Sequence, residues 1–160
     1  MVASMSNKEL PMSIPLDSDG FMRRECPTCE RELKWHPTPE GEEGIPAPDA
    51  GYFCPYCAVQ APTTAWWTQD QLKAVEAKVH NEVVKPMLDD FGQSLQRSSS
   101  ANFKVTSKPT ESEDEPQLTE TDDMRRVDFA CHPTEPVKVL DSWDQAVHCI
   151  VCAQPATSTG

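Results

Sequence analysis

The chain has 160 residues, of which 38% are hydrophobic and 15 are prolines, so it holds little material for one continuous core. Its formal net charge of -12 is spread over both halves and disfavours sequence-independent binding to a phosphate backbone. No apolar run is long enough to cross a bilayer, so the sequence predicts no membrane-spanning helix.

Residues 1–20 mix Ser, Met, Pro and Asp without periodicity and lack the basic-then-apolar order of a secretory signal. We expect a flexible leader there, and a cytoplasmic protein. Thiols stay reduced in that compartment, so seven cysteines, several of them paired at two-residue spacing, indicate metal ligands rather than disulfides.

Two cysteine pairs organise the first part of the chain. Cys26 and Cys29 form the first pair, and Cys54 and Cys57 form a second pair with the same spacing. Each pair puts two thiolates on one tight turn, and two such turns facing each other make the tetrahedral sulfur cage that Zn²⁺ prefers. The pattern therefore predicts a structural zinc site.

Short strands should flank these turns. Residues 21–25 lead into the first turn, and residues 31–35 leave it with the alternation of a half-buried strand. A Pro-, Gly- and Glu-rich stretch at 36–51 reads as a solvated loop, after which residues 52–53 form the return strand. This order of strands and cysteine turns resembles the zinc ribbons, over about 40 residues. The resemblance implies an antiparallel hairpin fold with the four cysteines as metal ligands.

A helix is predicted after the second turn. Thr68 is a candidate N-cap with Gln71 completing a capping box, and Trp67 precedes the cap as part of a hydrophobic staple. We expect Trp67 in the core, and a contact surface at either Trp66 or the far face of the helix around Val84 and Leu88. Pro86 should kink or end the helix. An apolar stripe at helical spacing should share a core with the ribbon; it consists of Leu72, Val75, Val79 and Val83.

Residues 98–123 are rich in Ser, Thr, Glu, Asp and Pro and have few apolar side chains, so they are read as a solvated linker. Beyond the linker, the approach to Cys131 echoes the approach to the first site, and Cys149 and Cys152 supply a later pair. This part looks like a second, divergent ribbon with three cysteines.

The fourth ligand of the second site is open between two histidines. His132 lies in the turn that lacks its second thiolate, whereas His148 lies beside a turn that already has two. We prefer His132. A metal-free hairpin with a buried Cys131 is the remaining alternative.

The sequence as a whole predicts a small metal-stabilised α+β fold in five segments. They are a flexible leader (1–20), a zinc ribbon followed by an amphipathic helix (21–97), an acidic linker (98–123), a second zinc-ribbon-like module (124–153) and a tail (154–160).

The sequence suggests four functions. Residues 54–57 spell the dithiol motif of glutaredoxins, but no βαβ pattern surrounds them and the metal competes for both thiolates. A catalytic zinc needs an open ligand position, which a four-sulfur site lacks. Nucleic-acid binding is the runner-up, through a weak basic cluster that consists of Arg23, Arg24, Arg31, Lys34, Trp35 and His36. The preferred interpretation is a non-catalytic adaptor that holds structural zinc and binds a protein partner, with no membrane association.

Overall fold

The computed structural model describes residues 10–37 and 44–157, and the chain divides into two compact units. One unit is drawn from residues 14–69 and 118–160, and the other from residues 1–13 and 70–117. The first unit contains the strands and the second contains the helix.

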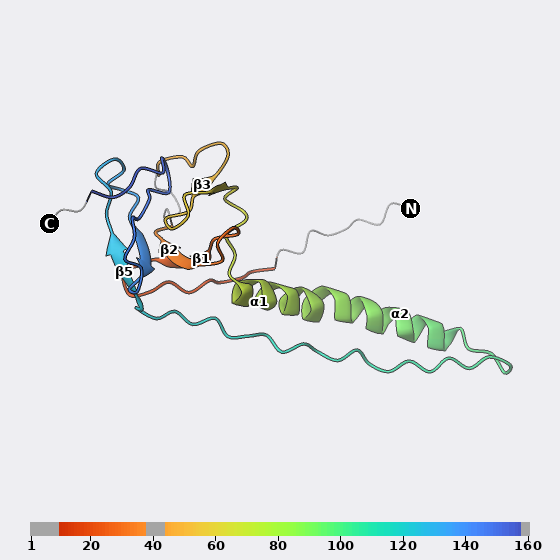
Figure 1. The fold of residues 1–160 in the computed structure, drawn as a ribbon. Helices are drawn as coiled ribbons and strands as arrows, with labels where there is room; N and C mark the ends of the chain where they lie inside the picture. Colours follow the sequence, from red (N-terminus) through yellow and green to blue (C-terminus); the bar gives the residue numbers. More distant parts are fainter. Residues whose placement is uncertain (1–9, 38–43, 158–160) are drawn as a thin grey trace. The chain divides into compact units, whose positions relative to one another are not determined.

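Four strands of the first unit form one antiparallel sheet in the order β1-β2-β6-β5 (Figure 1). They are β1 (Met22–Glu25), β2 (Glu32–Trp35), β5 (Met124–Val127) and β6 (Val137–Leu140). The hairpins β1–β2 and β5–β6 are joined through β2 and β6, where Lys34 lies opposite Lys138 and Trp35 opposite Val137. The two stretches expected as separate ribbon-like modules therefore share one sheet. A second sheet pairs β3 (Tyr52–Phe53) with β4 (Gln60–Ala61).

The core lies on the face of the four-stranded sheet that carries the alternate apolar residues of β2 and β6. Leu33 and Val139 are fully buried, and Trp35 contacts both Tyr52 and Trp66, with ring centroids 5.0 and 5.6 Å apart. Burying apolar side chains of this size stabilises a fold by about 2 kcal/mol each, which is substantial for so small a unit. The remaining buried members of this core are Cys26, Cys54, Tyr56, Ala61, Phe129, Val137, Val147, Cys149 and Ile150.

The expected roles of the two adjacent tryptophans are exchanged. Trp66 is 1% exposed, and its indole Nε1–H donates to the Ala61 carbonyl at 3.3 Å. Trp67 is only half-buried and lies against the Arg24 guanidinium, 5.1 Å from the ring centroid. The expectation of Trp66 as a contact residue is wrong, because its ring fills the space beside Trp35.

The second unit holds one helical segment in three consecutive parts. They are α1 (Gln69–Val79), a wider π turn η1 (His80–Val84) and α2 (Lys85–Arg97). The expectation that Pro86 ends the helix is wrong, because Pro86 is the second residue of α2 and the helical segment runs through it. Just before it, the Lys85 N–H donates to the His80 carbonyl five residues back. Wider turns of this kind accommodate an interruption of the regular helical ladder without ending the helix.

The predicted apolar stripe of this helix stays largely at the surface. Leu72 is 39% exposed, and Val79 and Val83 are each 36% exposed. The side of α1 that is buried carries Gln71, Ala74 and Ala77 instead. Within the described residues, these three positions of the stripe are exposed rather than buried.

Part of the expected solvated linker lies along the helix as an extended segment (Figure 1). The Thr110 N–H donates to Asp89 at 2.7 Å, and the Glu113 N–H donates to Asn81 at 2.8 Å. Gly92 allows a close approach, because a Cβ at this position would lie 2.1 Å from the Ser107 hydroxyl. Backbone groups of this polar segment are therefore hydrogen-bonded by polar side chains of the helix.

Candidate metal centres

Three turns of the chain have the same local structure. In each one, the N–H of the residue after the second cysteine donates to the carbonyl of the first cysteine at 2.9 Å. We call these the cysteine turns, and they are residues 26–30, 54–58 and 149–153. The first cysteine of each turn also donates its own N–H to a carbonyl just beyond the turn. The acceptors are Arg31 for Cys26, Val59 for Cys54 and Gln154 for Cys149. Short sequence spacing thus produces the same backbone arc three times.

The last residue of each cysteine turn has a left-handed backbone. Its φ is 58° at Glu30, 57° at Ala58 and 61° at Ala153. Glycine is the residue that adopts this conformation without steric cost, and none of the three positions has it. The turns are therefore held in a strained conformation by what surrounds them.

Backbone N–H groups in the turns point at the sulfur of the first cysteine. Cys26 Sγ accepts from the Thr28 and Cys29 N–H groups at 3.3 and 3.4 Å. Cys54 Sγ accepts from Tyr56, and Cys149 Sγ accepts from Val151, each at 3.4 Å. Such bonds stabilise a sulfur that carries negative charge, as a metal-bound thiolate does.

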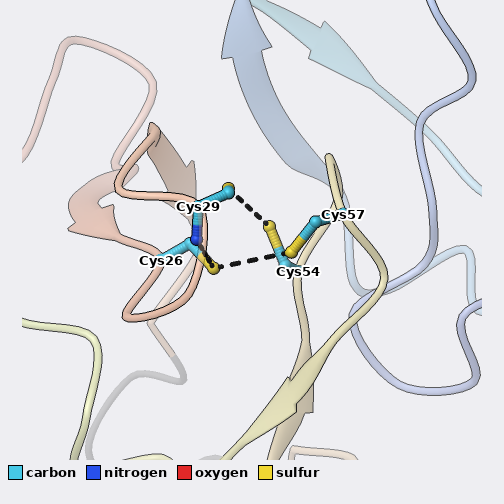
Figure 2. A group of neighbouring side chains, drawn as sticks. All are labelled: Cys26, Cys29, Cys54 and Cys57. Carbon is cyan, nitrogen blue, oxygen red and sulfur yellow. Dashed lines mark hydrogen bonds between the residues drawn. The ribbon is translucent and has the colours of Figure 1, made fainter.

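The first cluster consists of Cys26, Cys29, Cys54 and Cys57, whose sulfur atoms all lie within 4.8 Å of one another. Figure 2 shows the two turns facing each other, with Cys26 Sγ 3.8 Å from Cys57 Sγ and Cys29 Sγ 3.7 Å from Cys54 Sγ. Zn–S bonds of about 2.3 Å in a tetrahedron put the sulfurs about 3.8 Å apart. The arrangement thus fits a tetrahedral zinc ion, and it leaves no ligand position for water.

Because the first cluster is buried, negative charge on its thiols is unfavourable unless a cation compensates it. Burial raises the pKa of Cys26 and of Cys54. Burial also opposes ionisation of Cys29, but backbone and thiol hydrogen bonds outweigh it and lower the pKa of Cys29. Several thiolates at this spacing require a cation between them, because like charges in a buried site repel strongly.

The second cluster consists of Cys131, His132, Cys149 and Cys152, whose ligand atoms also lie within 4.8 Å of one another. Cys152 Sγ is 3.5 Å from Cys131 Sγ, and Cys149 Sγ is 3.4 Å from His132 Nδ1. A tetrahedral zinc with one imidazole would put sulfur and nitrogen about 3.6 Å apart. The donor set fits one zinc ion held by three thiolates and one histidine.

The structure separates the two candidate histidines. His132 lies in the second cluster, whereas His148 Nδ1 lies 3.1 Å from the Pro55 carbonyl. Adjacent Cys131 and His132 both reach the cluster because the chain bends there, with the Glu135 N–H donating to the His132 carbonyl at 3.1 Å. This bend replaces a fourth cysteine turn.

The two clusters are joined through their turns. The Phe53 N–H donates to the Ile150 carbonyl at 2.8 Å, and the His148 N–H donates to the Pro55 carbonyl at 2.9 Å. Buried Tyr56 adds a link, because its hydroxyl donates to the Glu32 carbonyl at 2.6 Å and accepts the Leu140 N–H at 2.9 Å. One side chain of the first cluster's turn thus ties β2 to β6.

The sequence interpretation missed a buried ion network on the opposite face of the sheet. The side chains of Lys34 and Asp17 are fully buried, and Asp17 Oδ2 lies 3.2 Å from Lys34 Nζ and 2.8 Å from Lys138 Nζ. Glu120 bonds Lys34 and Arg23, each at 2.8 Å. The signal was present, since Leu33-Lys34-Trp35 and Val137-Lys138-Val139 each alternate and place a lysine away from the core.

The basic cluster considered for nucleic-acid binding is occupied by internal contacts. Arg23 bonds Glu32, Glu120 and Asp123, and Lys34 is buried. Arg24 lies between the Trp35 and Trp67 rings, and Arg31 lies over the Trp143 ring at 4.9 Å. Trp35 is 8% exposed and belongs to the core.

Comparison of the chain with family models, with curated proteins and with solved structures gave no match. In the described part of the chain, none of the helices combines the length and the apolar character that a membrane span needs.

Proposed function

We propose that this protein is a non-catalytic, cytoplasmic adaptor in which two structural zinc ions hold the fold and a protein partner is bound. The observation that carries the zinc assignment is the pair of clusters, one with four thiols and one with three thiols and an imidazole. Zinc is the metal that fits, because tetrahedral sulfur and mixed sulfur–nitrogen sites are characteristic of it. The chain's own turns would hold the ions, and zinc would supply structural cross-links rather than chemistry on a substrate.

Exposed apolar side chains on α2 support the protein-binding part of the proposal. Met87 is 69% exposed, Phe91 is 62% exposed and Leu88 is 48% exposed. Apolar side chains clustered on an exposed surface are a feature of sites that bind other proteins.

Nucleic-acid binding stays the alternative function. Its candidate residues are engaged in ion pairs and ring contacts within the chain, and the net charge of -12 opposes an approach to phosphates. These observations favour a protein partner over nucleic acid.

Elemental analysis tests the zinc assignment. We expect two zinc ions per wild-type chain and one in the Cys131→Ser variant, because that substitution removes a ligand of the second cluster alone. One zinc in both proteins would remove the second site from the proposal. A folded chain without zinc, which also binds none when zinc is added, would overturn the structural role.

A binding experiment tests the adaptor role. The zinc-loaded chain is immobilised beside a Phe91→Ser variant, and lysate is applied with and without nuclease. A protein that is retained by the wild type after nuclease treatment and reduced at least about tenfold by the substitution supports the proposal. Capture that disappears with nuclease, and that weakens steeply with salt, would support the nucleic-acid alternative instead.

A further inference from the structure

The two clusters differ in how far solvent reaches their sulfur atoms. In the first cluster Cys26 and Cys54 are buried and the other two cysteines are half-buried. In the second cluster Cys149 alone is buried, Cys152 is half-buried and Cys131 is exposed. The sulfur atoms of the second cluster are therefore more accessible to a small oxidant in solution than those of the first.

Cys131 also lies outside the cysteine turns. Unlike Cys26, Cys54 and Cys149, it does not open such a turn, and the N–H···S bonds given above for the described residues go to those three sulfurs and not to the sulfur of Cys131. A thiolate with few hydrogen bonds and open access keeps more of its nucleophilicity. A second thiol is close enough to form a disulfide with Cys131, because Cys152 Sγ lies 3.5 Å from Cys131 Sγ on a different part of the chain.

We propose that Cys131 and Cys152 form a peroxide-sensitive pair, whose oxidation to a disulfide releases the ion of the second cluster. The inference rests on the proposed function, since it takes the second cluster to hold zinc. The modification is reversible by a dithiol reductant.

The chemistry balances with hydrogen peroxide as the oxidant. The Cys131 thiolate attacks one peroxide oxygen, the O–O bond breaks, and a sulfenic acid and hydroxide form. The Cys152 thiolate then attacks the Cys131 sulfur, forming the S–S bond and expelling a second hydroxide. Two thiolates lose two electrons in total, one peroxide gains them, and two protons from solvent convert the hydroxides to water.

The consequence for the metal follows from the ligand count. A disulfide at Cys131 and Cys152 leaves His132 and Cys149 as the second cluster's ligands, which is half of the set that a structural zinc uses. The first cluster keeps its four thiolates. The protein would thus lose one zinc ion of two.

The test treats the zinc-loaded full chain with hydrogen peroxide and follows zinc release with a colorimetric chelator. Free thiols are then alkylated and disulfides are mapped by mass spectrometry without reduction. We expect one zinc to be released at least about tenfold faster than the other, together with a Cys131–Cys152 disulfide. Dithiothreitol followed by zinc should restore the original content.

The matched control is Cys131→His, which keeps four ligands in the second cluster but cannot form the disulfide. Its zinc content is measured first, and its release by peroxide should then be at least about tenfold slower than that of the wild type. Equal release of both zinc ions, or a disulfide within the first cluster, would overturn the inference. Disulfide mapping decides the matter even when the second cluster binds no zinc, whereas a chain that never binds zinc contradicts the proposed function itself.

Discussion

One residue in each cysteine turn has a strained backbone conformation. Glu30, Ala58 and Ala153 adopt a left-handed backbone although each has a Cβ. The conformation persists because the N–H of each residue closes the turn onto a cysteine carbonyl. The strain can therefore be removed by substitution without disturbing the ligands.

The Ala58→Gly substitution should stabilise the zinc-loaded chain by about 1 kcal/mol, because glycine adopts a positive φ without steric cost. Chemical denaturation at constant free zinc measures the change. Ala77→Gly in α1 is the opposite control and should destabilise by at least about 1 kcal/mol, since glycine weakens a helix interior. A destabilising effect of Ala58→Gly would show that the turn is not strained.

Asp17 is the residue that compensates two buried lysines. Burial opposes its ionisation, but hydrogen bonds from Lys138, the Phe21 N–H and Lys34 outweigh this and lower the pKa of Asp17 to about 2. Its folded-state pKa lies below its unfolded value, so its contribution to stability is complete above about pH 4 and is lost as the pH falls toward 2.

The Asp17→Asn substitution should destabilise the fold by about 3 kcal/mol, because Lys34 and Lys138 lose a shared buried counter-charge. The loss should be the same at pH 6 and pH 8, where the Asp17 carboxylate is fully ionised. Denaturation curves of both proteins at the two pH values measure it. Asp19→Asn is the matched control: Asp19 bonds Lys138 at 2.6 Å but is 62% exposed, so its loss should cost below about 1 kcal/mol.

At the scale of elements, hydrogen bonds join turns and strands that lie far apart in the sequence. The turn of residues 54–58 contacts the turn of residues 149–153 through backbone bonds, and Tyr56 bridges β2 and β6. Burial raises the pKa of Tyr56 to about 12, so its hydroxyl stays protonated and able to donate near neutral pH.

The Tyr56→Phe substitution should cost about 2 kcal/mol, because the Glu32 carbonyl and the Leu140 N–H lose their partner. It should also make zinc in the second cluster easier to remove, although Tyr56 is not one of the proposed ligands. Zinc release to a competing chelator, followed in both proteins, checks this. Tyr52→Phe is the control, since the Tyr52 hydroxyl takes no part in the bridge. Unchanged release from Tyr56→Phe would show that the clusters act independently.

For the whole molecule, the shared sheet is the decisive feature. The strand β2 lies between β1 and β6, and its residues Leu33 and Trp35 pack in one core with Val137 and Val139. Zinc alone would cross-link the first hairpin but would leave these apolar side chains exposed.

A fragment of residues 1–97 should therefore fold poorly even with zinc, because it lacks β6 and the apolar residues of the second hairpin. Its zinc should be removed by a chelator at least about tenfold faster than the first cluster's zinc in the full chain. Chelator competition and amide proton dispersion in NMR spectra measure this. A well-dispersed fragment with unchanged zinc retention would support two independent modules.

The sequence by itself predicted the cysteine groups of the two clusters and the strands next to them. Cysteine spacing and alternating apolar residues are local patterns, and residues 26–29 and 54–57 could be assigned to one cluster from spacing alone. The tertiary structure decided that His132 lies in the second cluster, and it decided the burial of Trp66, the ion network around Asp17 and the pairing of β2 with β6. The ion network and the pairing of β2 with β6 join segments about a hundred residues apart, and no local pattern records which of several possible faces will meet.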